Sequence, residues 1–377
     1  MTQPGHGGNL AWAAVIAGCP TDAIIDFSAS ISPLGPPKSA MAAIVANLDN
    51  LSHYPDPDYR ELRTALGKLH QLPPEWILPG NGSAELLTWA GWDLATLAAT
   101  ALVTPAFGDY WRSLKAFKAN IYPFSIFAAL QGLDPYLKCD SASAPGYGLR
   151  NFLLSPQSSL HSYSPLERGL LLNNPHNPSG KLFLKESIAP FLDEFALVVV
   201  DEAFMDFLPP GEQQSLIPLV AKYPNLIILR SLTKFYSLPG LRIGYAIAHP
   251  DRLKLWQERR DPWSVGTLAA AAAIAIIQDT AFQQQTWDWL PSARSQLFTT
   301  LALLPGLQPM ASAANFLLVQ STSSVKPLQQ RLLQQHRILI RDCLSFPELG
   351  DFYFRVAVRS QGENEQLVKA IAQSIIN

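Results

Sequence analysis

The 377-residue sequence is poor in charge: Asp, Glu, Lys and Arg make up 15% of it, and the formal net charge is −2. No block of like charges occurs along the chain. Nucleic acids and anionic membrane surfaces are bound through clustered basic residues. We therefore expect neither kind of partner.

Long hydrophobic runs are also missing. The longest clean one, residues 268–277, is mostly alanine and falls well short of the ~20 residues that span a membrane. It predicts a buried helix instead. Residues 1–9 lack a basic stretch before an apolar run, so no secretory signal is expected.

Cysteine is scarce. Cys19, Cys139 and Cys343 are scattered, odd in number and without Cys-x-x-Cys spacing. Disulfides and structural zinc are therefore not expected, and the pattern favours a reducing cytoplasm. None of the seven histidines has metal-ligand spacing either. The sequence thus predicts no metal site.

Hydrophobic residues, in contrast, make up 48% of the chain, enough for a large domain and a smaller one. Short apolar runs, typical of strands buried on both faces, alternate with amphipathic stretches typical of helices. The predicted strands are residues 101–103, 169–172, 197–200, 226–229 and 242–248, and the predicted helices are residues 83–97 and 184–194. This alternation predicts an α/β fold with a mostly parallel sheet between helices.

The pattern changes after residue 262. Long helices are expected at residues 267–278 and 292–304, and strands at residues 315–319 and 353–358. We therefore expect a large domain over residues 46–264 and a small domain over residues 265–377. An N-terminal arm, residues 1–45, is expected to pack on the small domain.

Two strand ends carry reactive side chains. Asp201 directly follows the strand at residues 197–200, and the carboxyl end of a parallel strand faces the usual ligand crevice. A buried carboxylate needs a cationic partner such as a protonated pyridine nitrogen, although a helix cap is the alternative. Lys234 lies near Ser231, Thr233 and Arg242. Burial and nearby cations lower a lysine pKa, and hydroxyls with a guanidinium suit a phosphate; a solvated surface lysine is the alternative.

Two loops complete the pattern. The loop at residues 173–180 contains two Asn-Pro steps, which fix an extended, sharply turned backbone that can aim Asn177 at a ligand oxygen. Residues 80–85, Gly-Asn-Gly-Ser-Ala-Glu, start a helix whose free N–H groups can bind an anion. Taken alone, the first loop would be interpreted as an ordinary turn and the second as an ordinary helix cap.

These four motifs, in this order, resemble the fold-type I pyridoxal-phosphate enzymes of the aspartate aminotransferase superfamily. The resemblance covers residues 6–359 and lies in the class I/II branch that holds threonine-phosphate decarboxylase and histidinol-phosphate aminotransferase. It implies a seven-stranded, mostly parallel sheet, a smaller α+β domain and a cytoplasmic homodimer. It also implies pyridoxal 5'-phosphate as the cofactor.

The resemblance assigns cofactor roles by position. Lys234 matches the lysine that holds the cofactor as a Schiff base, Asp201 the partner of the pyridine nitrogen, and Asn177 the donor to the phenolic oxygen. Phe107 matches the aromatic residue that stacks on the ring. The phosphate site would comprise the backbone N–H groups of Ser83 and Ala84, the side chains of Ser231, Thr233 and Arg242, and Tyr54 from the other subunit.

Substrate roles follow in the same way. Arg355 matches the arginine that holds the substrate carboxylate. Residues 5–9, residues 26–37 and residues 340–343 are similar to the decarboxylase subgroup, and place His6 and Arg341 at a substrate phosphate. Ser30 and Ser32 stand where that subgroup usually has asparagine.

Another departure is Phe204, which occupies the place of a tyrosine in many aminotransferases and leaves Asn177 as the donor to the phenolic oxygen. Phenylalanine at this position is compatible with the decarboxylases.

The implied reaction is decarboxylation of L-threonine O-3-phosphate to (R)-1-aminopropan-2-yl phosphate, which in the family supplies the aminopropanol arm of cobalamin. Decarboxylation and transamination use the same cofactor motifs, so the choice between them depends on how the substrate is anchored. The alternatives are histidinol-phosphate aminotransferase or a related aminotransferase, and a non-catalytic pyridoxal-phosphate-binding regulator. Intact Lys234, Asp201 and Arg355 argue against the last.

Overall fold

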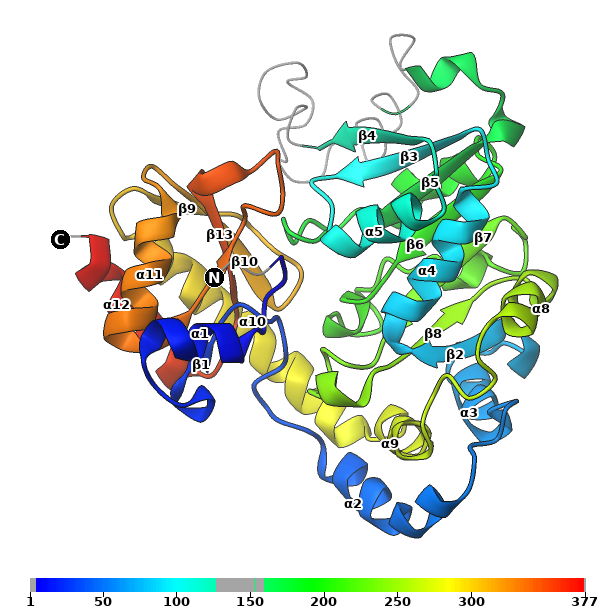
Figure 1. Cartoon of the computed structure of the whole chain (residues 1–377), viewed down its shortest axis with the longest axis horizontal. Helices are drawn as coiled ribbons and strands as arrows, with labels where there is room; N and C mark the ends of the chain where they lie inside the picture. Colours follow the sequence, from blue (N-terminus) through cyan, green and yellow to red (C-terminus); the bar gives the residue numbers. More distant parts are fainter. Residues whose placement is uncertain (1–4, 127–152, 154–158, 376–377) are drawn as a thin grey trace.

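A seven-stranded sheet forms the centre of the larger part of the computed structural model, which describes residues 5–126, 153 and 159–375 (Figure 1). Its strands, in the spatial order β2-β8-β7-β6-β5-β3-β4, are β2 (Ile77–Asn81), β8 (Ile243–Ile247), β7 (Leu226–Ser231), β6 (Leu197–Asp201), β5 (Arg168–Asn173), β3 (Ala99–Thr104) and β4 (Ile121–Ser125). Only β8 runs against its neighbours. The predicted mostly parallel α/β sheet is confirmed.

Both faces of this sheet are buried, as β6 illustrates. Val198 and Val200 belong to one hydrophobic cluster, and Leu197 and Val199 belong to the other. Successive strand residues point to opposite faces, so the run is apolar throughout because neither face meets water. The covering helices are α3 (Arg60–His70), α4 (Gly82–Leu94), α5 (Gly108–Ala116), α8 (Pro250–Arg259) and α9 (Thr267–Ile277).

The sequence located the five strands β3, β5, β6, β7 and β8 but missed the two edge strands. Pro79 and Gly80 interrupt the apolar pattern of β2, and β4 contains Pro123 and is only partly buried. The helix predicted over residues 184–194 is wrong in extent. It consists of α7 (Lys185–Ile188) followed by the 3₁₀ turn η8 (Ala189–Leu192), where Pro190 has no N–H to continue α-helical bonding.

A second, antiparallel sheet forms the smaller part, in the order β12 (Arg341–Asp342), β13 (Tyr353–Ala357), β10 (Phe316–Ser321) and β9 (Leu307–Pro309). Its helices are α10 (Thr280–Ala302), α11 (Val325–His336) and α12 (Gln361–Ile375). The helix predicted from residue 292 begins much earlier, because α10 continues through Pro291.

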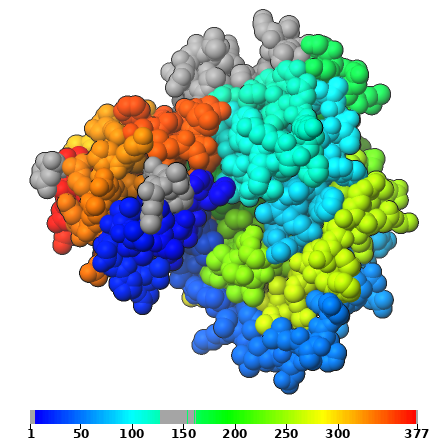
Figure 2. All heavy atoms as spheres, in the orientation of Figure 1, coloured from blue at the N-terminus to red at the C-terminus, as the bar shows by residue number. Residues whose placement is uncertain are grey.

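The N-terminal residues lie against this smaller part. Helix α1 (Leu10–Ala17) packs on α11, and β1 (Ile25–Asp26) pairs in parallel with β11 (Ile338–Leu339) (Figure 1). The chain then crosses to α2 (Lys38–Ala46), which packs on α9. In Figure 2 the blue N-terminal residues lie at the surface between the orange and cyan parts.

Short 3₁₀ turns connect these elements. They are η1 (Thr21–Ala23), η2 (Leu48–Ser52), η3 (Pro74–Trp76), η6 (Ser159–Ser162), η7 (Pro165–Glu167), η9 (Met205–Phe207), η10 (Ile217–Leu219), η11 (Pro239–Leu241) and η12 (Gly350–Phe352). Within the described ranges, no helix combines the length and apolarity needed to cross a membrane.

Candidate active site

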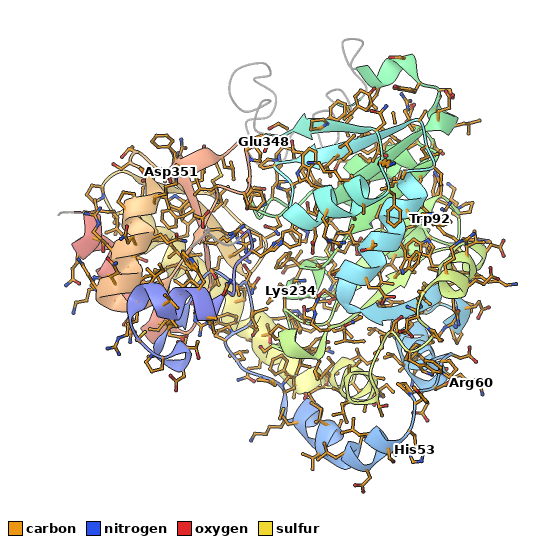
Figure 3. All side chains as sticks on the ribbon, viewed as in Figure 1. His53, Arg60, Trp92, Lys234, Glu348 and Asp351 are labelled. Atoms are coloured by element: carbon orange, nitrogen blue, oxygen red, sulfur yellow. The ribbon has the colours of Figure 1, made fainter. Side chains whose placement is uncertain are left out.

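A cavity of about 250 Å³ lies where the carboxyl ends of the parallel strands meet the second sheet and the N-terminal arm. In Figure 3, Lys234 lies between the two parts of the molecule. Ten of the residues singled out in the sequence line the cavity: His6, Ser83, Ala84, Phe107, Asn177, Asp201, Thr233, Lys234, Arg242 and Arg355. The fold therefore brings together most of the predicted site from segments far apart in the chain.

Lys234 is partly buried just beyond the end of β7. Its Nζ donates to Ser231 Oγ at 3.0 Å, and that hydroxyl lies 2.8 Å from Thr233 Oγ1. Burial lowers the pKa of Lys234, and the positive charges of Arg242 and Arg355 lower it further, although Asp201 opposes them. A larger fraction of the amine is therefore in the neutral, nucleophilic form.

Asp201 is the last residue of β6 and is 7% exposed. Its Oδ2 accepts a hydrogen bond from the Tyr110 hydroxyl at 2.8 Å, and its Oδ1 accepts one from the Ala203 N–H at 2.9 Å. Burial raises the pKa of this carboxyl, while Lys234 and the two donors lower it. Both donors are neutral, which leaves the carboxylate able to pair with a ligand cation.

Tyr110 was given no role in the sequence analysis. The available signal was its position three residues after Phe107, at the start of α5, because residues three apart share a helix face. The rings of Phe107 and Tyr110 lie edge to face at 5.9 Å.

The start of α4 forms a cradle for an anion. Gly82 has φ +72°, and a Cβ there would lie 2.6 Å from an Arg242 guanidinium nitrogen. A Cβ on Gly244 would lie 2.7 Å from the Ser83 nitrogen. Only glycine permits these approaches, and together with the first N–H groups of the helix they suit a phosphate.

The second sheet contributes guanidinium groups. Arg355 donates to Asn177 Oδ1 at 2.5 Å and to the Ser28 carbonyl at 3.2 Å. Since the amide oxygen of Asn177 is engaged in this way, its amide nitrogen is the group that can donate to a ligand.

Arg341 and His6 lie at a second, smaller cavity, which shares His6 with the larger one. Arg341 donates to the Gly5 carbonyl at 2.7 Å and to Ser345 Oγ at 2.5 Å. The His6 ring lies 5.3 Å from the ring of Phe107. The arm therefore reaches from the second sheet to the aromatic wall of the larger cavity.

Three predicted features need separate comment. Ser231 lies behind Lys234 rather than on the cavity wall, and the ring of Phe204 lies 5.6 Å from Lys234 Nζ. Tyr54 does not line the cavity of its own chain. It is 79% exposed and stacks on Trp263 with ring centroids 4.4 Å apart.

Metal ligands do not gather at this site. Among the residues that the structure describes, no group of three or more His, Cys, Asp or Glu side chains is placed to hold a metal ion. Cys19 and Cys343 are free thiols, and Cys139 lies outside the described residues.

The donor set fits pyridoxal phosphate. A buried carboxylate held by neutral donors suits a pyridinium nitrogen, a partly buried amine of lowered pKa suits an aldehyde, and the glycine-lined helix start with Arg242 suits the phosphate. The Phe107 ring is available as an aromatic wall.

Comparisons with known proteins show the family of the chain. The sequence profile described as "Aminotransferase class I and II" matches residues 22–371. The threonine-phosphate decarboxylase of Salmonella typhimurium is 38% identical over 371 residues, covering 97% of this chain and 95% of that protein. Histidinol-phosphate aminotransferase 2 of Ralstonia nicotianae is 33% identical over 300 residues, covering 79% of this chain and 74% of that protein.

The fold is also shared with solved structures. The histidinol-phosphate aminotransferase of Sinorhizobium meliloti, solved in complex with pyridoxal-5'-phosphate, superimposes with a TM-score of 0.81 at 22% identity. The match covers 100% of this chain and 96% of that one.

Proposed function

The chain belongs to the class I and II aminotransferase family of pyridoxal-phosphate enzymes, and on that premise we propose that it decarboxylates L-threonine O-3-phosphate to (R)-1-aminopropan-2-yl phosphate. The reaction makes it a carboxy-lyase. The product is the one that supplies the aminopropanol arm of cobalamin in the family that the sequence resembles.

One observation carries the choice of substrate: Arg341 on β12 is the direct antiparallel partner of Arg355 on β13. Directly opposed residues have side chains on the same face of a sheet, and like charges there repel. Arg341 is 5% exposed and Arg355 is 8% exposed. Burial lowers the pKa of Arg355 to about 10, and the charge of Arg341 lowers it as well.

Two buried cations side by side favour a ligand with two anionic groups, and Arg341 also lies 3.9 Å from the Asp342 carboxylate. L-Threonine O-3-phosphate has a carboxylate and a phosphate. Histidinol phosphate has a phosphate and no carboxylate, so an aminotransferase would meet both cations only with its co-substrate 2-oxoglutarate, which has two carboxylates. Arg355, on the wall of the larger cavity, would hold the carboxylate. Arg341, with His6, would hold the phosphate from the smaller cavity. Anchoring at both ends fixes which bond at Cα is presented for cleavage.

Pyridoxal phosphate, when bound, supplies the electron sink for the bond that breaks at Cα. Lys234 would bind it covalently, Asp201 would pair with its ring nitrogen, and the Asn177 amide would donate to its phenolic oxygen. Its phosphate would be held by the N–H groups of Ser83 and Ala84, with Thr233 and Arg242, and Ser231 would act from behind them through its contact with Thr233. The Lys234 amine is also the group placed to return a proton to Cα, since its lowered pKa suits proton transfer.

The proposal extends to assembly and location. Tyr54, exposed and stacked on Trp263, would reach the cofactor phosphate of a second copy, so the working form would be a homodimer in the cytoplasm. The chain would divide into an N-terminal arm (residues 1–45), a large domain (46–264) and a small domain (265–377).

The deciding experiment offers the purified holoenzyme two substrates. With L-threonine O-3-phosphate we expect stoichiometric release of carbon dioxide and aminopropanol phosphate. With histidinol phosphate plus 2-oxoglutarate we expect little glutamate. Efficient glutamate formation without carbon dioxide from threonine phosphate would instead establish an aminotransferase.

A further inference from the structure

A buried arginine lies next to the phosphate cradle without lining the cavity. Arg260 caps the end of α8, and its side chain is 1% exposed. It precedes the segment that leads through Trp263 into α9. None of the roles assigned above involves it.

Its contacts converge on the end of β2, where the chain enters α4. Nη1 of Arg260 donates to the Pro79 carbonyl at 2.5 Å and lies 3.7 Å from Glu85 Oε1. The other carboxylate oxygen, Glu85 Oε2, accepts the Asn81 N–H at 2.7 Å. The ion pair therefore holds the carbonyl before Gly80 and the N–H after it.

The residues held in this way immediately precede the cradle. Asn81 is the N-cap of α4 but makes no capping hydrogen bond with its own side chain. Glu85, from the first turn, instead satisfies the Asn81 N–H. The orientation of the next residues, Gly82, Ser83 and Ala84, depends on how this end of β2 is fixed, which is by β8 on one side and by Glu85 and Arg260 on the other.

We propose that Arg260 and Glu85 are positioning residues that fix the junction between β2 and α4 at residues 79–82, so that the N–H groups of Ser83 and Ala84 point at the cofactor phosphate. The inference concerns the cofactor site alone. It holds for either reaction considered above, so its failure and that of the decarboxylase assignment are separate results.

The burial of Arg260 supports this role. Desolvation lowers its pKa, and neither Nε nor Nη2 has a hydrogen-bond partner among the described residues. Burying a charge with so few partners costs stability, which an apolar side chain of similar size would avoid. The contacts to Pro79 and Glu85 are therefore what the guanidinium contributes.

A neighbouring tyrosine fixes the segment that carries Arg260. The Arg260 guanidinium carbon lies 6.0 Å from the centre of the Tyr59 ring. The Tyr59 hydroxyl donates to the Pro262 carbonyl at 3.2 Å and accepts the Val265 N–H at 2.9 Å. The arginine is thus anchored on both sides and can act as a fixed support.

The test compares two ligands on the apoprotein: pyridoxal phosphate and pyridoxal, which lacks the phosphate. For Arg260→Gln and Glu85→Ala we expect about a 10-fold or greater loss of affinity for pyridoxal phosphate, the scale of one charge-assisted hydrogen bond. Affinity for pyridoxal should stay within about twofold. The matched control is Arg259→Gln, because Arg259 is exposed, lies over Trp92 near the C-terminal end of α4, and donates to the Leu255 carbonyl within α8.

A second readout is the phosphorus-31 resonance of the bound cofactor, which should shift in both variants and not in Arg259→Gln. Should Arg260→Gln fail to fold, Glu85→Ala carries the test, since Glu85 is at the edge of the buried pair at 20% side-chain exposure. Equal losses for both ligands, or no loss for pyridoxal phosphate, would overturn the proposal.

Discussion

The hydroxyl of Tyr110, at the start of α5, donates a 2.8 Å hydrogen bond to Oδ2 of Asp201 at the end of β6. Both side chains are buried. Burial raises the pKa of the carboxyl, while the charge of Lys234 and the hydrogen bond from the tyrosine lower it. Tyr110, which also lines the cavity, thus helps to keep the proposed ring-nitrogen partner ionised.

Replacing this tyrosine tests the relationship. Tyr110→Phe removes one hydrogen bond to a charged group, worth about 1.5–3 kcal/mol, so kcat should fall roughly 10- to 150-fold. Steady-state kinetics at saturating cofactor measure the effect. Tyr122→Phe is the control, because Tyr122 pairs with the Tyr163 hydroxyl on the edge of the sheet, away from the cavity. An unchanged kcat in Tyr110→Phe would contradict the assignment.

Lys234 should be the only covalent attachment point. Borohydride reduction of the yellow holoenzyme should fix the cofactor on Lys234, because this amine lies in the cavity and burial lowers its pKa. Peptide mass spectrometry identifies the site. Lys234→Ala should retain phosphate-dependent cofactor binding and lose turnover. A reduced adduct on any other lysine would contradict the assignment of Lys234 as the Schiff-base residue.

Arg341 should set the preference for a phosphorylated substrate. Arg341→Ala removes a guanidinium with charge-assisted bonds worth about 1.5–3 kcal/mol, so kcat/KM for L-threonine O-3-phosphate should fall roughly 10- to 150-fold. Turnover of free L-threonine should change little. Arg337→Gln, an exposed arginine at the end of α11, is the control. A parallel loss for both amino acids would mean that Arg341 acts elsewhere than on the phosphate.

The dimer proposal predicts complementation between inactive chains. Tyr54→Phe should weaken the phosphate site of the partner, and Lys234→Ala inactivates its own site. Hybrid dimers of the two contain one site with both residues intact, so mixing should restore activity, up to about a quarter of the wild-type level for random assortment. Sedimentation checks that hybrids form. A fully active monomer rules the arrangement out.

His70 should make the protein sensitive to mild acid. Its Nε2 lies 2.8 Å from the Tyr245 hydroxyl, and burial together with Arg230 lowers its pKa from 6.5 to about 3. Above pH 6.5 His70 is neutral in both the folded and the unfolded form. Its protonation then costs no folding stability. Between pH 6.5 and about 3 only the unfolded chain binds a proton at His70. The free energy of unfolding therefore decreases, as the pH is lowered, by up to about 1.4 kcal/mol per pH unit.

Thermal unfolding midpoints of the wild type and of two histidine variants, measured from pH 7.5 to 5, test the contribution of His70. His70→Gln should flatten the decline, whereas His53→Gln, at an exposed position labelled in Figure 3, should follow the wild type. Parallel curves for His70→Gln and the wild type would show that His70 is not the responsible group.

The sequence by itself determined which of the predicted side chains line the cavity. Lys234, Asp201 and Asn177 could be found because each closely follows an apolar strand. Parallel strands bring their carboxyl ends to one edge of a sheet, so local patterns sufficed to predict that these side chains meet. The edge strands β2 and β4 were not predicted, because prolines in both strands and the partial exposure of β4 interrupt the apolar run that indicates a buried strand.

Only the tertiary structure decided the pairings that tune the site. Arg341 opposes Arg355 through the register of β12 and β13, Tyr110 meets Asp201 across 91 positions, and Arg260 reaches the Pro79 carbonyl across 181. Each contact depends on strand register or helix packing between distant segments. The hydrophobic pattern within one segment cannot predict which distant residue its side chains will contact, because those contacts are set by how the whole core packs.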